Sequence, residues 1–146
     1  MRLYLDTSVF SAYYDERAPE RMEQTRKFWI ELNQHEKLCS TLTLEEIARA
    51  SDAKAQKMRG LATDFRILQI DEEARGLAQS YVQHDVVPTK YFVDALHIAV
   101  AVLGEADILV SWNFDHMVKR GTRLLVNYVN STKGLRNIEI LAPPEI

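Results

Sequence analysis

The chain of 146 residues has one cysteine and no apolar segment near the roughly twenty residues that span a membrane. A single Cys39 excludes an internal disulfide and argues against a zinc cluster. Because it follows Leu38 in an apolar segment, we interpret it as a small core residue. The residues before Asp6 are too few for a signal peptide. We therefore expect a cytoplasmic protein without a membrane segment.

The sequence also lacks internal repeats, low-complexity tracts and recognisable linkers, so we predict one domain over residues 1–146. Its 47% hydrophobic and 27% charged residues are typical of a globular protein. The formal net charge of −3 neither requires nor forbids a nucleic-acid partner. A basic rim around an acidic pocket can bind phosphate whatever the total charge.

Predicted strands and helices alternate along the chain. Strands are expected at residues 2–6, 38–41, 65–70, 107–111 and 138–141. Helices are expected at residues 8–15, 20–35, 43–63 with a break near 51–52, 71–83, 88–104 and 114–120, before an irregular basic stretch. This order predicts an α/β fold, with a mostly parallel sheet covered by helices on both faces.

Asp6 directly follows the first predicted strand, and the small polar residues Thr7 and Ser8 come next. Open α/β sheets bind ligands at the carboxyl ends of their strands, which favours a functional carboxylate here. The competing interpretation is a helix cap or an Asx turn. Because Thr7 and Ser8 can themselves cap the next helix, the balance moves toward function.

Glu46 is the second acidic candidate. The segment Thr43-Leu44-Glu45-Glu46 predicts a capping box, with Thr43 as the N-cap and Glu46 at the third helical position. The start of this helix faces the same sheet edge, so a cap and a metal contact do not exclude each other. The flanking residues Leu44 and Ile47 do not determine whether Glu45 or Glu46 points inward.

Asp94 lies inside a helix, residues 91–103, that is apolar almost all round. A buried aspartate is unfavourable unless it is paired, hydrogen-bonded or bound to a metal, so we predict a functional role. Asp6, Glu46 and Asp94 would then form an acidic pocket whose repulsion a divalent cation relieves. We interpret His97 as a structural histidine, with support of a site residue as the alternative.

A fourth corner follows the strand at 107–111. Ser111 and Asn113 emerge at the same predicted edge as Asp6. Asn113 is either a site residue or the cap of the predicted helix at 114–120. Asp115 would lie within that helix and is expected to be solvated.

The segments Leu5-Asp6-Thr7-Ser8, Glu46, Asp94–Ala99 and Leu109–Asn113 together resemble the PIN-domain ribonucleases, and most of all VapC-type toxins of toxin–antitoxin operons. The resemblance implies a three-layer α/β/α fold with a five-stranded parallel sheet. It also implies a pocket for Mg²⁺ or Mn²⁺, hydrolysis of RNA, a cognate antitoxin and a homodimer.

By this resemblance Asp6, Glu46 and Asp94 match the three main acids, and Glu46 is preferred to Glu45. Asp6 and Asp94 would hold the main metal, while Glu46 shares it or orients water. Thr7, Ser111 and His97 would support them. Water would attack in line and leave a 5′-phosphate and a 3′-hydroxyl.

The chain departs from the family at Asn113, where many relatives carry aspartate. An amide adds no charge, which makes a catalytically degenerate scaffold that binds RNA or a protein the main alternative. A phosphoacceptor signalling domain is disfavoured because no aspartate ends the middle strand. Basic residues expected to contact phosphate are Arg49, Lys54, Lys57, Arg59, Lys119, Arg120, Arg123, Lys133 and Arg136.

Overall fold

The central strand of the sheet is β1 (Arg2–Leu5), whose residues Leu3, Tyr4 and Leu5 are completely buried. In the computed structural model, which describes all 146 residues, the strand order is β3–β2–β1–β4–β5. The others are β2 (Glu36–Ser40), β3 (Arg66–Leu68), β4 (Ile108–Val110) and β5 (Glu139–Leu141). All four strand pairs are parallel, which confirms the predicted sheet.

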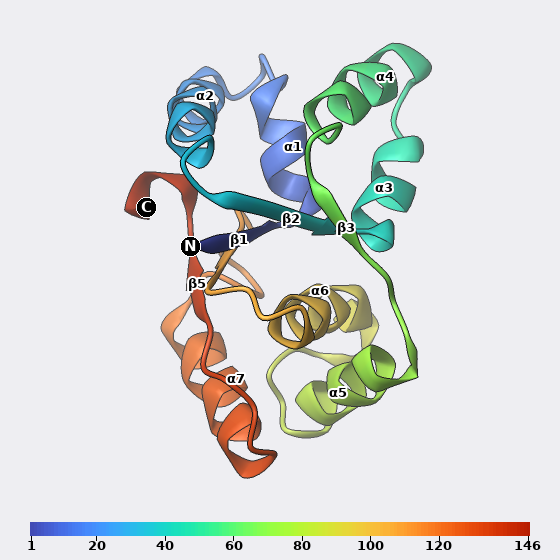
Figure 1. Cartoon of the computed structure of the whole chain (residues 1–146), viewed down its shortest axis with the longest axis vertical. Helices are drawn as coiled ribbons and strands as arrows, with labels where there is room; N and C mark the ends of the chain where they lie inside the picture. The colour runs from blue at the N-terminus through green and yellow to red at the C-terminus, as the bar shows by residue number, and fades with distance from the viewer.

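Helices cover both faces of this sheet (Figure 1). One layer contains α1 (Thr7–Tyr13), α2 (Pro19–Leu32), α3 (Thr41–Ala48) and α4 (Asp52–Leu61). The other contains α5 (Glu72–Gln83), α6 (Phe92–Leu103) and α7 (Arg120–Thr132). Two 3₁₀ turns, η1 (Thr89–Tyr91) and η2 (Pro143–Glu145), precede α6 and follow β5. The predicted three-layer α/β/α fold is therefore confirmed.

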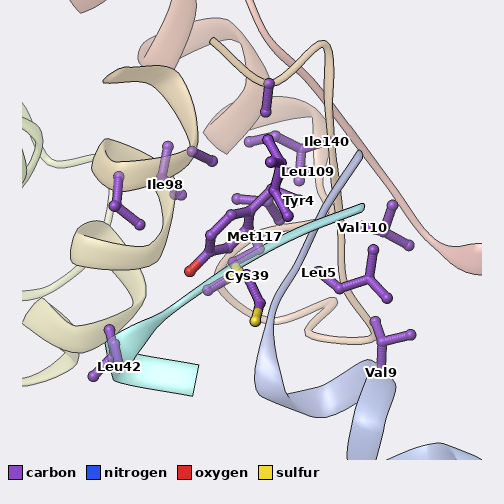
Figure 2. Close-up of a cluster of buried hydrophobic side chains, with 14 of the residues drawn as sticks. Tyr4, Leu5, Val9, Cys39, Leu42, Ile98, Leu109, Val110, Met117 and Ile140 are labelled. Atoms are coloured by element: carbon purple, nitrogen blue, oxygen red, sulfur yellow. The ribbon is translucent and has the colours of Figure 1, made fainter. Parts of the chain in front are cut away.

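The core is one hydrophobic cluster of 41 buried residues from both helical layers and the sheet. Figure 2 shows the ring of Tyr4 among Leu109, Ile98 and Ile140, with its hydroxyl directed toward α6. Cys39 is fully buried, and this burial raises the pKa of its thiol to about 12. The thiol therefore stays neutral near pH 7, as expected of a core residue.

The region after β4 differs from the sequence-based expectation. Residues 114–119 form turns instead of a helix, and α7 occupies the stretch predicted to be irregular. The buried residues of α7 are Thr122, Val126, Val129 and Asn130, which recur at helical spacing. Two of these four are polar, so a pattern based on hydrophobicity does not reveal the helical periodicity.

Polar side chains of α7 attach it to the rest of the fold. Asn130 accepts a hydrogen bond from the Tyr81 hydroxyl at 2.5 Å and donates one to the Arg136 carbonyl at 3.0 Å. Asn127 donates to the Ile138 carbonyl at 3.0 Å and accepts from the Ile138 amide at 2.9 Å. These bonds place α7 against both α5 and the start of β5.

No helix in the structure combines the length and the apolar composition that a membrane crossing requires.

The amino edge of the sheet is closed by Asp107, just before β4. Its carboxylate accepts hydrogen bonds from the Arg2 amide at 2.8 Å and from the Arg136 guanidinium at 2.9 Å. These two donors stabilise the charged form, the Arg2 amide most, and hold the pKa of Asp107 below its usual range. Asp107 thus lies at the edge opposite Asp6 and has a structural role.

We predict that Asp107→Asn lowers the free energy of unfolding at pH 7 by about 1 kcal/mol. A lowered folded-state pKa stabilises the fold above the unfolded-state pKa of about 4, and the contribution disappears as the pH falls through the folded-state pKa. Urea denaturation at pH 7 and pH 2.5 should therefore show a smaller difference from wild type at pH 2.5 than at pH 7. Asp115→Asn, at an exposed carboxylate without a hydrogen bond, is the control.

Candidate functional site

Asp6 is the centre of the site and lies between β1 and α1. It is the N-cap of α1, because its Oδ1 accepts a hydrogen bond from the Ser8 amide at 3.1 Å. The Ser8 hydroxyl donates to the same oxygen at 2.5 Å, and the Ser111 hydroxyl donates to Oδ2 at 2.7 Å. The cap interpretation is thus correct, and the carboxylate is also only 4% exposed.

The two serine hydroxyls connect Asp6 to the turn after β4. The Ser8 hydroxyl accepts from the Trp112 amide at 2.9 Å, and the Ser111 hydroxyl accepts from the Asn113 amide at 2.9 Å. Each hydroxyl proton is therefore left for the carboxylate, and both oxygens of Asp6 are satisfied. The two serines thus link the Asp6 carboxylate to the backbone of this turn.

Glu46 points into the site and Glu45 is exposed, as the resemblance predicts. The Oε1 atom of Glu46 accepts hydrogen bonds from the Thr7 hydroxyl at 2.8 Å and from His97 Nε2 at 2.6 Å. The predicted capping box was wrong by three residues. The N-cap of α3 is Ser40, with Thr43 at the third helical position, which leaves the Glu46 side chain free for the site.

His97 belongs to a buried chain of hydrogen bonds behind Glu46. Its Nδ1 lies 2.7 Å from the Tyr4 hydroxyl, which lies 2.9 Å from the Ser40 hydroxyl. Burial raises the pKa of Tyr4 far above its usual value, so this phenol keeps its proton. We infer that Tyr4 donates to Nδ1 and that Nε2–H donates to Glu46. His97 is thus a structural residue that also positions Glu46.

Sequence analysis did not identify Tyr4 or Ser40 as parts of this chain. Tyr4 looks like an ordinary core aromatic, and its partner His97 is 93 residues away. Ser40 did carry a signal, because it ends a buried strand at the same edge as Asp6.

Asp94 is half-buried in the first turn of α6. Burial raises its pKa, and the charge of Asp6 adds to this effect, while His116, His97 and the Asn113 amide oppose it. Burial likewise raises the pKa of Asp6; His97 opposes this and the charge of Glu46 adds to it. The three predicted carboxylates therefore lie near enough to influence one another.

The pKa of Glu46 shifts in the opposite direction. Burial alone would raise its pKa, but the hydrogen bonds from His97 and from the Thr7 hydroxyl lower it overall. The site therefore combines one carboxylate whose pKa is lowered, Glu46, with two whose pKa burial raises, Asp6 and Asp94.

The turn after β4 contains the predicted residue Asn113 and also His116, which sequence analysis missed. Asn113 Oδ1 accepts from the His116 amide at 2.9 Å and caps a turn, not the predicted helix. Asp115 is exposed and makes no side-chain hydrogen bond, as expected for a solvated residue. The His116 ring stacks on Tyr91, with centroids 3.9 Å apart and planes at 30°, and its charge acts on Asp94.

The acidic pocket offers oxygen donors, the ligands that Mg²⁺ and Mn²⁺ prefer. No three acidic, histidine or cysteine side chains are arranged to share one metal ion. Mg²⁺ usually takes only one or two carboxylates and completes its shell with water and substrate phosphate. The raised pKa values of Asp6 and Asp94 fit such a site, because a cation would relieve them.

Three of the nine predicted basic residues have contacts that bear on their position relative to the site. Arg49 lies near enough to Glu46 to lower its pKa. In contrast, Arg136 is bound to Asp107 at the opposite edge of the sheet, and Arg123 faces Glu145. Arg136 therefore lies away from the acidic pocket.

We predict that Tyr4→Phe lowers the free energy of unfolding by about 1–3 kcal/mol, because His97 Nδ1 loses its buried donor. Urea denaturation measures this change. The control is Tyr128→Phe on α7, where the exposed hydroxyl makes no hydrogen bond and its loss should change stability by less than about 0.5 kcal/mol. Equal effects of the two substitutions would contradict the proposed donor role.

Comparison with known proteins places this geometry in a family. The family model described as PIN domain matches residues 3–120, whereas a search of curated proteins finds no match. The structure resembles VapC20 of Mycobacterium tuberculosis, described as a toxin that cleaves the sarcin–ricin loop. The TM-score is 0.60 and the identity 18%, over 93% of this chain and 98% of that one.

Two further structures are similar over nearly the whole chain. VapBC2 of Rickettsia felis, solved with a fragment of promoter DNA, gives a TM-score of 0.61 at 12% identity, over 97% of this chain and 98% of that one. VapBC-1 of nontypeable Haemophilus influenzae gives 0.59 at 12%, over 98% of each chain. Such low identities establish a common fold. With the family model matching most of the sequence, the chain belongs to the PIN domain family.

Proposed function

We propose that the protein is a metal-dependent endoribonuclease and the toxin of a toxin–antitoxin pair. The observation that carries this proposal is an acidic edge of the parallel sheet: Asp6 caps α1 there and Thr7 and His97 hold Glu46. Asp94 lies near enough for the charge of Asp6 to raise its pKa. Membership of the PIN family and the fold shared with VapC toxins support it.

Asp6 and Asp94 would hold Mg²⁺ or Mn²⁺. When bound, such an ion supplies a water activated for attack on the phosphodiester and stabilises the leaving oxygen. Asp6 is kept in place by Ser8 and Ser111. Glu46, fixed by Thr7 and His97, has the lowered pKa of a group that stays ionised and can orient water.

The same site suggests its partners. RNA is the substrate that an acidic metal pocket with nearby Arg49 and His116 would bind. Two of the similar structures are VapBC assemblies, which supports a cognate antitoxin for this chain. We also propose a homodimer. The alternative, an RNA-binding scaffold without hydrolysis, is favoured by one observation, the neutral amide of Asn113 in place of a fourth acid.

The direct test is cleavage of structured and single-stranded RNAs in Mg²⁺, Mn²⁺ and EDTA. We expect metal-dependent cutting that leaves 5′-phosphate and 3′-hydroxyl ends. Asp94→Asn should reduce the rate at least roughly a hundredfold, because it removes a charge from the pocket without changing side-chain size. Asp115→Asn is the matched control and should cut like wild type.

Three results would contradict the proposal. Products with a 2′,3′-cyclic phosphate would exclude attack by water. Equal cutting by Asp94→Asn and wild type would place the reaction elsewhere. RNA binding without cutting in any metal would support the scaffold.

A second prediction concerns the missing fourth acid. Asn113→Asp keeps the oxygen that accepts from the His116 amide and adds a negative charge beside Asp94. We expect Mn²⁺ to bind roughly tenfold more tightly, equivalent to about 1.4 kcal/mol. Titration followed by electron paramagnetic resonance of free Mn²⁺ measures this. Unchanged or weaker binding would show that residue 113 does not face the ion.

A further inference from the structure

A hollow of about 660 Å³ lies beside the acidic site, between the start of α2 and the turn after β4. It is lined by Ala18, Pro19, Glu20, Arg21, Gln24 and Trp112. None of these residues belongs to the carboxylate pocket. Trp112 nevertheless connects the two, because its amide donates to the Ser8 hydroxyl that in turn donates to Asp6.

The Trp112 indole forms a rigid wall of this hollow. Its Nε1 donates to the Thr25 hydroxyl at 2.9 Å, and Thr25 in turn donates to the Arg21 carbonyl at 2.7 Å. Trp112 is 7% exposed, and hydrogen bonds hold both its backbone amide and its ring. Its position therefore does not depend on the guanidinium above it.

The Arg21 guanidinium lies over the Trp112 ring and has no anionic partner. Its guanidinium carbon is 4.7 Å from the Trp112 ring centroid and 5.9 Å from that of Phe114. The side chain is exposed, makes no hydrogen bond and has no carboxylate partner. By comparison, the nearby Arg17 is paired with Asp15 at 2.9 Å. The planar donors of Arg21 are thus oriented by the aromatic rings and free to bind an oxyanion.

Phe114 adds an exposed aromatic surface next to this cation. It is 47% exposed, and its ring centroid lies 6.1 Å from that of Trp112. An aromatic face beside an unpaired cation is the arrangement with which proteins bind single-stranded nucleic acid.

We propose that Arg21, Trp112 and Phe114 form a subsite for one unpaired nucleotide of RNA, next to the phosphate at the acidic pocket. Arg21 binds its phosphate, and its base stacks on Phe114 against the wall of Trp112. Only an unpaired base is available for such stacking, so the subsite selects single-stranded RNA or loops. The proposal rests on RNA being the substrate of the neighbouring site.

A protein partner is the competing occupant. An exposed phenylalanine alone would suit an apolar side chain. The unpaired guanidinium and the two-bond connection from Trp112 to Asp6 favour a phosphate that continues into the site. A protein occupant is therefore an outcome of the test.

The experiment measures binding separately from cutting. The Asp94→Asn protein, labelled with 5-fluorotryptophan, is titrated in EDTA with a single-stranded RNA oligonucleotide and followed by ¹⁹F NMR. The chain has two tryptophans, so Trp29, which packs against Phe10 and Phe65, provides an internal reference. We expect the Trp112 resonance to shift while that of Trp29 does not, and duplex RNA of the same sequence to give no shift.

Substitutions then test each contact. Arg21→Ala and Phe114→Ala should each weaken RNA binding roughly tenfold. Arg21→Ala should also reduce the slope of log K against log salt by about 0.7, the value of one phosphate contact on a single strand. The matched control is Arg26→Ala on the same helix, whose guanidinium donates to the Tyr13 carbonyl and should not matter.

The proposal is overturned if Arg21→Ala binds RNA like Arg26→Ala, or if RNA binds without moving the Trp112 resonance. The proposal is also overturned if RNA leaves the Trp112 resonance unchanged and only a protein partner shifts it. The product of a neighbouring small open reading frame is one such partner. A cleavage assay with the wild-type residue Asp94 distinguishes the nucleotide subsite from the proposed RNA hydrolysis. Cutting that is insensitive to Arg21 and Phe114 refutes the subsite alone, whereas a shifted Trp112 without cutting refutes hydrolysis alone.

Discussion

The burial of one charge, the Asp6 carboxylate, is the constraint on which the rest of the site depends. A carboxylate out of water is stable only with several donors, and here they are the hydroxyls of Ser8 and Ser111 and one backbone amide. Those hydroxyls accept from the turn after β4, so a single desolvated group determines where that turn lies. The turn carries Trp112 and Asn113, whose amides donate to these two hydroxyls.

A second set of buried bonds connects the two helical layers through the sheet. Glu46 on α3 is hydrogen-bonded to His97 on α6, and the other ring nitrogen of His97 is hydrogen-bonded to Tyr4 on β1. Glu46 is thus supported by the buried residues His97 and Tyr4. The environments of Asp6 and Glu46 move their pKa values in opposite directions, the usual way in which one pocket separates the roles of similar acids.

Sequence reasoning succeeded where a rule of topology applies and failed where a polar group is buried. Asp6 and Ser111 follow strands whose carboxyl ends must meet in a parallel sheet, so their proximity was predictable. Helix α7 was not, because Asn130 is buried by bonds to Tyr81 and Arg136 that no hydropathy pattern reveals. The capping box was misplaced because Ser40 and Thr43 are both good caps, and only the end of β2 distinguishes them.

The two bonds between Asn127 and Ile138 have a consequence for the behaviour of the molecule in a crowded solution. Strand β5 is an edge of the sheet, and Glu139 directs its amide to Asp107, so the polar groups of Ile138 face outward. Exposed edge groups are where a strand from another chain adds and aggregation begins. Asn127 occupies both groups of Ile138, so a side chain from α7 occupies the place that an invading strand would need.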